Sequence, residues 1–170
     1  GYGDGLKLKV IASQNVTSLG PAQIVQSQLK KVGIDIEMDV VEHATYHQQI
    51  RQNLSDIVVY GASRFPVAGN YLKEFYHSGS SVGTPTAVTN FSHCKVADKE
   101  IDEAAEEIEQ AKQIKLWEVA QEKIIADVCA VPLFEQKLVW ARRAGLDYGY
   151  KLDGSLSYGP LITEKTTLTK

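Results

Sequence analysis

The sequence predicts an α/β fold, with an open, mainly parallel twisted sheet and flanking helices. Residues 6–60 alternate between segments with the two-residue period of strands and segments with the 3.6-residue period of helices. A strand, a helix and a second strand within about 35 residues form a right-handed crossover, which makes the two strands parallel. This region therefore predicts a βαβαβ unit.

The first three elements of this unit have the clearest patterns. A strand is predicted at Leu6–Ala12, where apolar residues alternate with lysines. A helix is predicted at Pro21–Val32, because proline suits the first turn of a helix and Gly33 suits the residue after a helix end. A second strand is predicted at Ile34–Val41, where apolar residues alternate with Asp and Glu.

A second helix is predicted at Tyr46–Leu54 and a third strand at Asp56–Tyr60. The continuous apolar run of this strand is typical of burial on both faces, and Gly61 permits a sharp turn directly after it. The following stretch is rich in loop-forming residues. It predicts a short helix around Tyr71–Tyr76 and an exposed, mobile segment at Ser78–Thr86.

The helical period returns at Asp98, a residue type favoured as an N-cap. Two apolar helix faces fall out of step around Glu109–Lys112, so two helices are expected to meet there in a tight bend. A strand opened by Pro132 is predicted at Ala130–Arg142. The residues after Arg143 show little periodicity.

The composition is that of an ordinary globular protein, with 44% apolar and 23% charged residues in a chain of 170. This length suits one domain, which we expect to span residues 1–170. The net charge of −3 provides no basic surface for nucleic acid. No apolar run approaches the ~20 residues of a membrane helix. No signal peptide opens the chain, which in an excised piece says little about location.

The cysteines and histidines were the first candidates for metal or redox chemistry. Cys94 and Cys129 are too far apart for a CxxC motif. Their spacing leaves a disulfide open, although two free thiols, one of them buried at a helix end, are the favoured expectation. His43 and His47 are four residues apart but have no acidic partner between them to complete a metal motif. We therefore expect no metal site.

Motifs of the common enzyme classes are missing from the sequence. The glycines at positions 1, 3 and 5 precede the first strand, whereas a dinucleotide fingerprint follows it. There is no GxSxG nucleophile motif. The carboxylates between Asp98 and Glu109 lie on the polar face of an amphipathic helix. We expect neither an enzyme nor a bound cofactor.

The candidate binding site follows the strand predicted at Asp56–Tyr60, because ligands of open α/β sheets bind outside the carboxyl ends of the strands. Ser63, Arg64 and Phe65 lie in this loop. An arginine beside an aromatic ring offers a bidentate clamp for a carboxylate and a flat apolar surface. The alternative is that Arg64 is solvated and Phe65 fills the core.

Several short segments, in the same order along the chain, resemble those of the family 5 extracellular solute-binding proteins. The resemblance extends from about Leu6 to Arg143. The matching segments are Gln28–Ile34 (QLKKVGI), Glu42–Tyr46, Asp56–Gly61 (DIVVYG), Asn90–Ser92, Asp98–Ala104, Trp117–Ile125 and Ala130–Leu133.

The resemblance implies the C-terminal lobe of a longer, two-lobed binding protein of the type II periplasmic class. Such a protein is extracytoplasmic, in some cases lipid-anchored, and passes a small solute, most often peptide-like, to the permease of an ABC importer. The missing N-terminal lobe would supply the other wall of the cleft. Carried over by position, the ligand-binding residues would be Ser63, Arg64, Phe65, Asn90, Phe91, Ser92 and Trp140. An indole buried under the last strand is the alternative for Trp140.

The chain departs from the family pattern after Gly61. Members often carry a tryptophan after this glycine and an acidic residue followed by proline, but no acidic residue occurs here before Pro66. Arg64 therefore predicts an anionic or carboxylate-bearing solute. Two rival classes remain open: a small flavodoxin-like enzyme with Ser13–Ser18 as its phosphate loop, and an interaction module without a solute.

Overall fold

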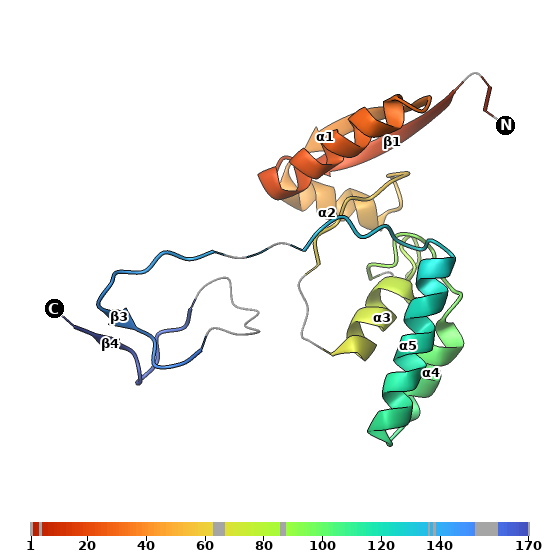
Figure 1. The fold of residues 1–170 in the computed structure, drawn as a ribbon. Helices are drawn as coiled ribbons and strands as arrows, with labels where there is room; N and C mark the ends of the chain where they lie inside the picture. Colours follow the sequence, from red (N-terminus) through yellow and green to blue (C-terminus); the bar gives the residue numbers. More distant parts are fainter. Residues whose placement is uncertain are drawn as a thin grey trace. The chain divides into compact units, whose positions relative to one another are not determined.

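The computed structural model describes residues 2–3, 5–62, 67–85, 88–135, 137, 139–151 and 160–169. The chain forms two compact units, one of Gly1–Ala62 with Ala68–Ala130 and one of Ser63–Val67 with Val131–Lys170. Within the described residues, the first unit contains a parallel pair of strands and the α-helices, and the second contains a short antiparallel pair (Figure 1). The expectation of one domain over residues 1–170 stays a prediction.

Strands β1 (Leu6–Ser13) and β2 (Ile34–Val41) pair in parallel over their whole length, with Leu6 opposite Ile34 and Ser13 opposite Val41. Helix α1 (Val16–Lys30) connects them. The predicted α/β class and the parallel crossover are therefore confirmed. Gly33, with a φ of +85°, makes the left-handed turn between the end of α1 and the start of β2 that its sequence position predicted.

Helix α1 begins five residues before the predicted start, so the placement of Pro21 in its first turn is wrong. The Asn15 side chain caps the helix, because its Oδ1 accepts a hydrogen bond from Thr17 N at 3.2 Å. Pro21 lies inside the helix. Its ring removes one backbone donor, which leaves the Thr17 carbonyl without its usual intrahelical partner.

Helix α2 (His43–Arg51) begins three residues before its predicted start because the Glu42 carboxylate caps it. Glu42 Oε2 accepts hydrogen bonds from Ala44 N at 2.8 Å and Thr45 N at 3.4 Å. A carboxylate at this position also interacts favourably with the positive end of the helix dipole.

Side chains alternate between the two faces of β1. Ile11 packs with Tyr46 and Ile50 of α2 in a buried apolar cluster. Val10 and Ala12 are also buried and point to the opposite face, while α1 runs against both strands. Helices α1 and α2 thus cover the two faces of the parallel pair (Figure 1).

The third strand predicted at Asp56–Tyr60 is wrong, because the structure has no strand there and its apolar residues are only half-buried. Side chains occupy the free edge of β1 instead. Lys9 N donates to Asp56 Oδ2 at 2.7 Å, and Ile11 N donates to Ser55 Oγ at 2.9 Å. Ser and Asp side chains compete with backbone carbonyls for such N–H groups, so a regular ladder does not form.

The rest of the first unit is a group of three helices, α3 (Ala68–Tyr76), α4 (Asp98–Glu106) and α5 (Gln110–Ala126), in mutual contact (Figure 1). The short helix predicted around Tyr71–Tyr76 and the tight bend between two late helices are confirmed. The buried core of this group is formed by Leu72, Cys94, Ala97, Ile101, Ala120 and Ile124.

One ion pair joins α4 to α5 inside this group. Glu100 is buried, and its carboxylate accepts a hydrogen bond from Lys123 Nζ at 2.7 Å. This hydrogen bond holds the pKa of Glu100 below its ordinary value. The pair therefore allows a charged side chain to lie in the helix interface.

One local prediction for the loop before α4 is wrong, and a second is confirmed only in part. Asp98 does not cap α4, since Ala97 holds the N-cap position and no side chain caps the helix. The Asp98 carboxylate accepts hydrogen bonds from the backbone N of Ser78, at 2.9 Å, and from its hydroxyl. The segment Ser78–Thr86 was predicted to be exposed; residues 78–79 and 83–85 are exposed, but a 3-10 turn opens the segment and residues 80–82 are buried.

Cys94 and Cys129 form a disulfide across 35 residues of sequence, with their Cα atoms 5.6 Å apart. The expectation of two free thiols is therefore wrong. The bond ties the loop before α4 to the chain just after α5. Disulfides persist in oxidising compartments such as the periplasm and the cell surface and are rare in the cytosol.

In the second unit, β3 (Leu146–Asp147) pairs antiparallel with β4 (Thr167–Leu168). The strand predicted at Ala130–Arg142 is wrong, because none of its described residues lies in a strand. The apolar residues Leu133 and Val139 of this segment are 52% and 89% exposed. Among the described helices of both units, none has the length and apolar content to cross a membrane.

Breaking the disulfide should destabilise the helical group. The double variant Cys94→Ala with Cys129→Ala is expected to lose about 2–4 kcal/mol of unfolding free energy, because the cross-link restricts the unfolded chain. Urea denaturation with and without dithiothreitol measures this loss. The reductant should weaken the native chain and leave the double variant unchanged; equal midpoints for both chains in both conditions would refute a stabilising role.

Candidate functional site

The carboxyl ends of β1 and β2 lie at one edge of the sheet, which we call the carboxyl edge and define by Ser13 and Val41. Gln14 N donates to Val41 O at 2.9 Å and extends the pairing one residue further. Both α1 and α2 begin beside this edge, with their N-caps at Asn15 and Glu42. Ligands of open α/β sheets bind at such an edge.

Three polar side chains from β1 and α2 meet at the carboxyl edge. Ser13 Oγ lies 3.3 Å from His43 Nδ1, and His43 Nε2 lies 3.2 Å from His47 Nε2. Burial lowers the pKa of His47, and the charges of His43 and Arg51 lower it further. Ser13 has no exposed surface, so its hydroxyl orients His43 and is not presented to a substrate as a nucleophile.

An aromatic cluster, formed by Tyr60, Phe75 and Phe91, adjoins these histidines. The ring centroid of Tyr60 is 5.0 Å from that of Phe91, 5.9 Å from that of Phe75 and 5.9 Å from that of His47. These separations are those of favourable aromatic pairs. Tyr60 therefore connects the start of the predicted binding loop to both α2 and the segment around Phe91.

The segment that leads to Tyr60 is held by a buried tyrosine of α2. Tyr46 Oη donates to Val59 O at 2.8 Å, and burial raises the pKa of Tyr46 far above its ordinary value. The phenol thus stays protonated and keeps its donor role. This bond fixes the backbone two residues before Gly61, where the predicted binding loop begins.

The structure brings only some of the predicted site residues into view. Ser63, Arg64 and Phe65 lie outside the described residues. Phe91 is half-buried and lies beside Tyr60, the residue from which the loop with Ser63, Arg64 and Phe65 starts. Ser92 is exposed. Trp140 belongs to the second unit and is 37% exposed, so its indole is not fully buried. Their roles in ligand binding stay predictions.

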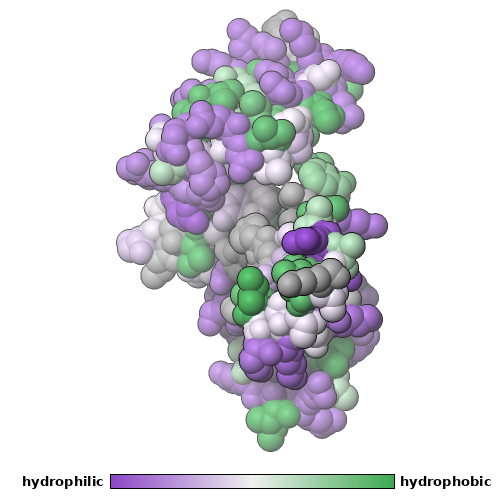
Figure 2. Space-filling view, turned by 90° about the vertical axis from the view of Figure 1, so that its left-hand side faces the viewer, coloured by the Kyte–Doolittle hydropathy of each residue, from purple (hydrophilic) through white to green (hydrophobic). Residues whose placement is uncertain are grey.

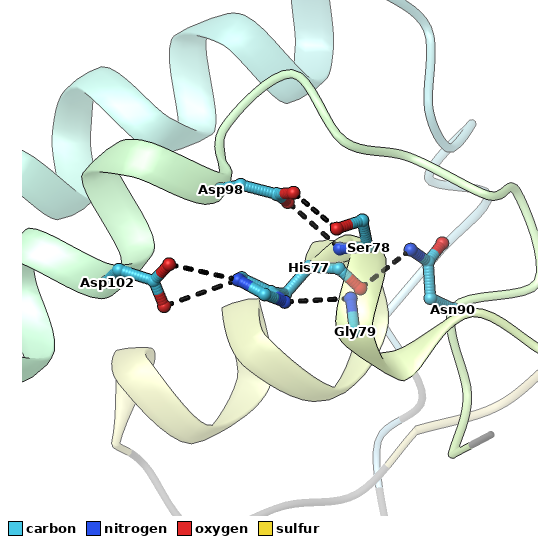
Figure 3. A network of polar contacts seen from close by, with 6 residues as sticks. All are labelled: His77, Ser78, Gly79, Asn90, Asp98 and Asp102. Atoms are coloured by element: carbon cyan, nitrogen blue, oxygen red, sulfur yellow. Dashed lines mark hydrogen bonds and ion pairs between the residues drawn. The ribbon is translucent and has the colours of Figure 1, made fainter. Parts of the chain in front are cut away.

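Asn90 is completely buried and organises the loop on which Phe91 and Ser92 stand (Figure 3). Its Nδ2 donates to His77 O at 2.9 Å and to Cys94 O at 2.8 Å. Its Oδ1 accepts from Cys94 N at 3.0 Å. The amide is thereby used within the protein, so Asn90 positions its neighbours, and solute contact by its side chain stays a prediction.

The same loop is tied to α4 by a network of carboxylates (Figure 3). Asp98 binds Ser78, and His77 Nε2 lies 3.3 Å from the Asp102 carboxylate. His77 Nδ1 accepts a hydrogen bond from Gly79 N at 2.9 Å. This assignment places the imidazole proton on Nε2, toward Asp102, and gives His77 a structural role in the turn.

Sequence reasoning missed Tyr60 as the centre of the aromatic cluster and the contact between the two α2 histidines. The i, i+4 spacing of His43 and His47 was the available signal, and it was set aside because no acidic partner accompanies them. Within the described ranges, no group of three or more His, Cys, Asp or Glu side chains could hold a metal ion. On the face drawn in Figure 2, hydrophobic residues are interspersed with hydrophilic ones among the coloured atoms.

The sequence matches no protein-family model and no curated protein. Among solved structures, the PBP/SBP MoaA from A. tumefaciens R10, in complex with mannopinic acid, is 48% identical, with a TM-score of 0.84. The match covers 98% of this chain and 34% of MoaA.

Two more distant structures support the fold. DppA from Helicobacter pylori, an ABC transporter-associated periplasmic binding protein in complex with the peptide STSA, is 24% identical over 78% of this chain and 26% of its own, with a TM-score of 0.67. A substrate-binding protein from Microbacterium hydrocarbonoxydans, complexed with 4-hydroxybenzoate hydrazide, is 18% identical over 97% of this chain and 34% of its own, with a TM-score of 0.74.

The parallel crossover, the flanking helices and these neighbours define the fold as that of the type II periplasmic binding proteins. Binding proteins, not enzymes, make up these neighbours. The chain spans about a third of the length of the MoaA structure it matches. It belongs to the family 5 extracellular solute-binding proteins.

The two polar residues beside Phe91 should differ sharply in their contribution to stability. Asn90→Ala is expected to cost about 2–4 kcal/mol, because it leaves several buried backbone groups of His77 and Cys94 without a partner. Ser92→Ala, the matched control, removes an exposed side chain whose hydroxyl donates only a long hydrogen bond to Asn90 Oδ1, at 3.3 Å, and should stay within about 0.5 kcal/mol. Thermal and urea unfolding of both variants measure this. Equal stability of the two variants would contradict the organising role of Asn90.

Proposed function

We propose that this chain is the C-terminal lobe of a two-lobed protein that captures a small solute for an ABC importer outside the cytoplasm. The lobe supplies one wall of the ligand cleft, and the N-terminal lobe of the same protein supplies the other. The closed protein then delivers its solute to the membrane permease. The observation that carries this proposal is the 48% identity to MoaA over 98% of the chain.

Two further observations support the proposal. The chain spans 34% of MoaA, 26% of DppA and 34% of the Microbacterium protein, as a single lobe of a longer protein would. The disulfide between Cys94 and Cys129 fits an oxidising compartment such as the periplasm or the outer face of the cell membrane. A lipid anchor on the full-length protein is compatible with either location.

The wall is proposed to consist of the loop after Tyr60 and the segment Asn90–Ser92, with Trp140 as a further contact. Tyr60 and Phe91 lie in ring contact, so the described start of the loop and this segment are neighbours. Phe91 contributes a half-buried aromatic surface, and Ser92 an exposed hydroxyl. The loop after Tyr60 contributes Ser63, Arg64 and Phe65, which come next in the sequence after Gly61 and Ala62.

The proposed solute is a small, carboxylate-bearing molecule, either peptide-like or an acid of the kind bound by the neighbours. Arg64 supplies the guanidinium that carboxylates pair with in bidentate fashion, and the acidic residue common in the family after Gly61 is missing. MoaA was solved with mannopinic acid, and the agropinic-acid complex of AgaA shares the fold. An acid therefore suits both the loop chemistry and the relatives.

Arg64→Ala in the full-length protein should weaken solute binding about 10- to 100-fold, the value of a charge-assisted hydrogen bond pair. The solute is first identified by mass spectrometry of the small molecules that co-purify with the protein, and affinity is then measured by isothermal titration calorimetry. Arg64→Lys should recover only part of the affinity, because lysine keeps the charge but loses the planar fork.

The matched control for Arg64 is Lys31→Ala. Lys31 is an exposed cation at the C-terminal end of α1, the end of the helix remote from the carboxyl edge. Its removal changes the net charge equally and should leave the affinity unchanged. If Arg64→Ala and Lys31→Ala give the same dissociation constant as the native protein, the carboxylate clamp is refuted.

The isolated 170-residue chain should bind the identified solute at least about 100-fold more weakly than the full-length protein, because a clamp buries its ligand between both lobes. Parallel calorimetric titrations of the two proteins measure this ratio. Equal affinities would show that one lobe holds the complete site and would contradict the two-walled cleft.

A further inference from the structure

His43 and His47 form an imidazole pair that the proposed solute-capture function does not use. They occupy successive turns of α2 at the carboxyl edge, and their ring planes stand at 88° with centroids 4.5 Å apart. The Nε2 atoms of the two rings face each other at 3.2 Å. His43 is exposed and His47 half-buried, so the space beside these nitrogens is open to solvent.

This separation suits two nitrogens that share one metal ion. Imidazole nitrogens lie about 2.0–2.1 Å from a bound zinc ion, so two of them at an angle of about 90–110° are about 2.9–3.4 Å apart. The observed distance of 3.2 Å falls inside that range. Rotation of the two rings, so that both Nε2 lone pairs point to one ion, would turn this hydrogen-bonded contact into a chelate.

The surroundings also fix the orientation of the exposed ring of this pair. Ser13 Oγ contacts His43 Nδ1 at 3.3 Å, on the far side of the ring from Nε2. A partner at the second nitrogen fixes the tautomer and the orientation of a metal-binding histidine.

We propose that His43 and His47 together bind one divalent transition-metal ion, such as Ni²⁺, Cu²⁺ or Zn²⁺, through their Nε2 atoms. Imidazole is a preferred ligand of these ions. The protein supplies two ligands from one helix, and water molecules complete the coordination. This site is independent of the identity of the solute, because both ligands belong to α2.

The test uses the 170-residue chain without an affinity tag, titrated with NiCl₂ in a calorimeter at about pH 7.5. We expect saturable binding of one ion per chain, lost at about pH 5 as protons occupy the imidazoles. Loss of an outer-shell partner alone typically weakens metal binding about 10- to 100-fold. His43→Gln and His47→Gln should therefore each weaken binding at least about 10-fold.

His77→Gln and His93→Gln are the matched controls, because each removes an imidazole of a different segment. Both should bind Ni²⁺ like the native chain, and circular dichroism should show that all four variants remain folded. In proton NMR spectra, Ni²⁺ should broaden the imidazole signals of His43 and His47 first. Absence of saturable binding, undiminished binding by the double variant H43Q/H47Q, or first broadening of His77 or His93 would overturn the proposal.

Discussion

The parallel register of β1 and β2 is the constraint on which the candidate site depends. Eight consecutive residue pairs, from Leu6–Ile34 to Ser13–Val41, align the carboxyl ends of both strands. A parallel crossover returns the chain to the amino end, so each strand delivers its following helix start to the same edge. Ser13, Asn15, Glu42 and His43 meet there for this reason, although up to 30 residues separate them.

Two other interactions secure the loop that brings Phe91 to this edge. Asn90 binds the backbone of His77 and Cys94, and the disulfide fixes Cys94 to the chain beyond α5. Irregular backbone has no regular partners for its N–H and C=O groups, as a strand has in a sheet. Here the buried Asn90 amide binds such groups, and the disulfide holds the loop in place. The aromatic surface of Phe91 is thus supported by the helical group, and the histidines by the parallel pair.

The sequence was sufficient where periodicity decides the structure and insufficient where single side chains do. Alternation in β1 and β2 predicted both strands and their pairing because one face of each is buried. Pro21 led to a wrong predicted start for α1. The Asn15 cap fixes the start of this helix, although Pro21 lacks the backbone N–H that would donate inside it. Ser55 and Asp56 replaced an expected strand through their own hydrogen bonds to β1, which no apolar pattern reveals.

The candidate site was predictable only to the level of the edge and the loop. Phe91 was expected near the loop after Tyr60 from a family resemblance, and the ring contact places it beside Tyr60. The burial of Asn90 and the cysteine pairing are long-range facts, because each depends on contacts between segments with unrelated patterns. The four-residue spacing of His43 and His47 indicates that they share one helix face. The contact between Ser13 and His43 could be known only from the fold.

The Ser–His contact at the carboxyl edge lacks two features of a nucleophilic pair. A Ser–His contact would suit a nucleophile if the hydroxyl were accessible and a carboxylate oriented the imidazole. Here Ser13 has no exposed surface, and the nearby Glu42 carboxylate is bound to the first turn of α2. The groups with exposed surface here are the imidazole of His43 and the half-buried rings of Tyr60 and Phe91. Aromatic rings hold a partner by shape, and imidazole nitrogens hold one through their lone pairs.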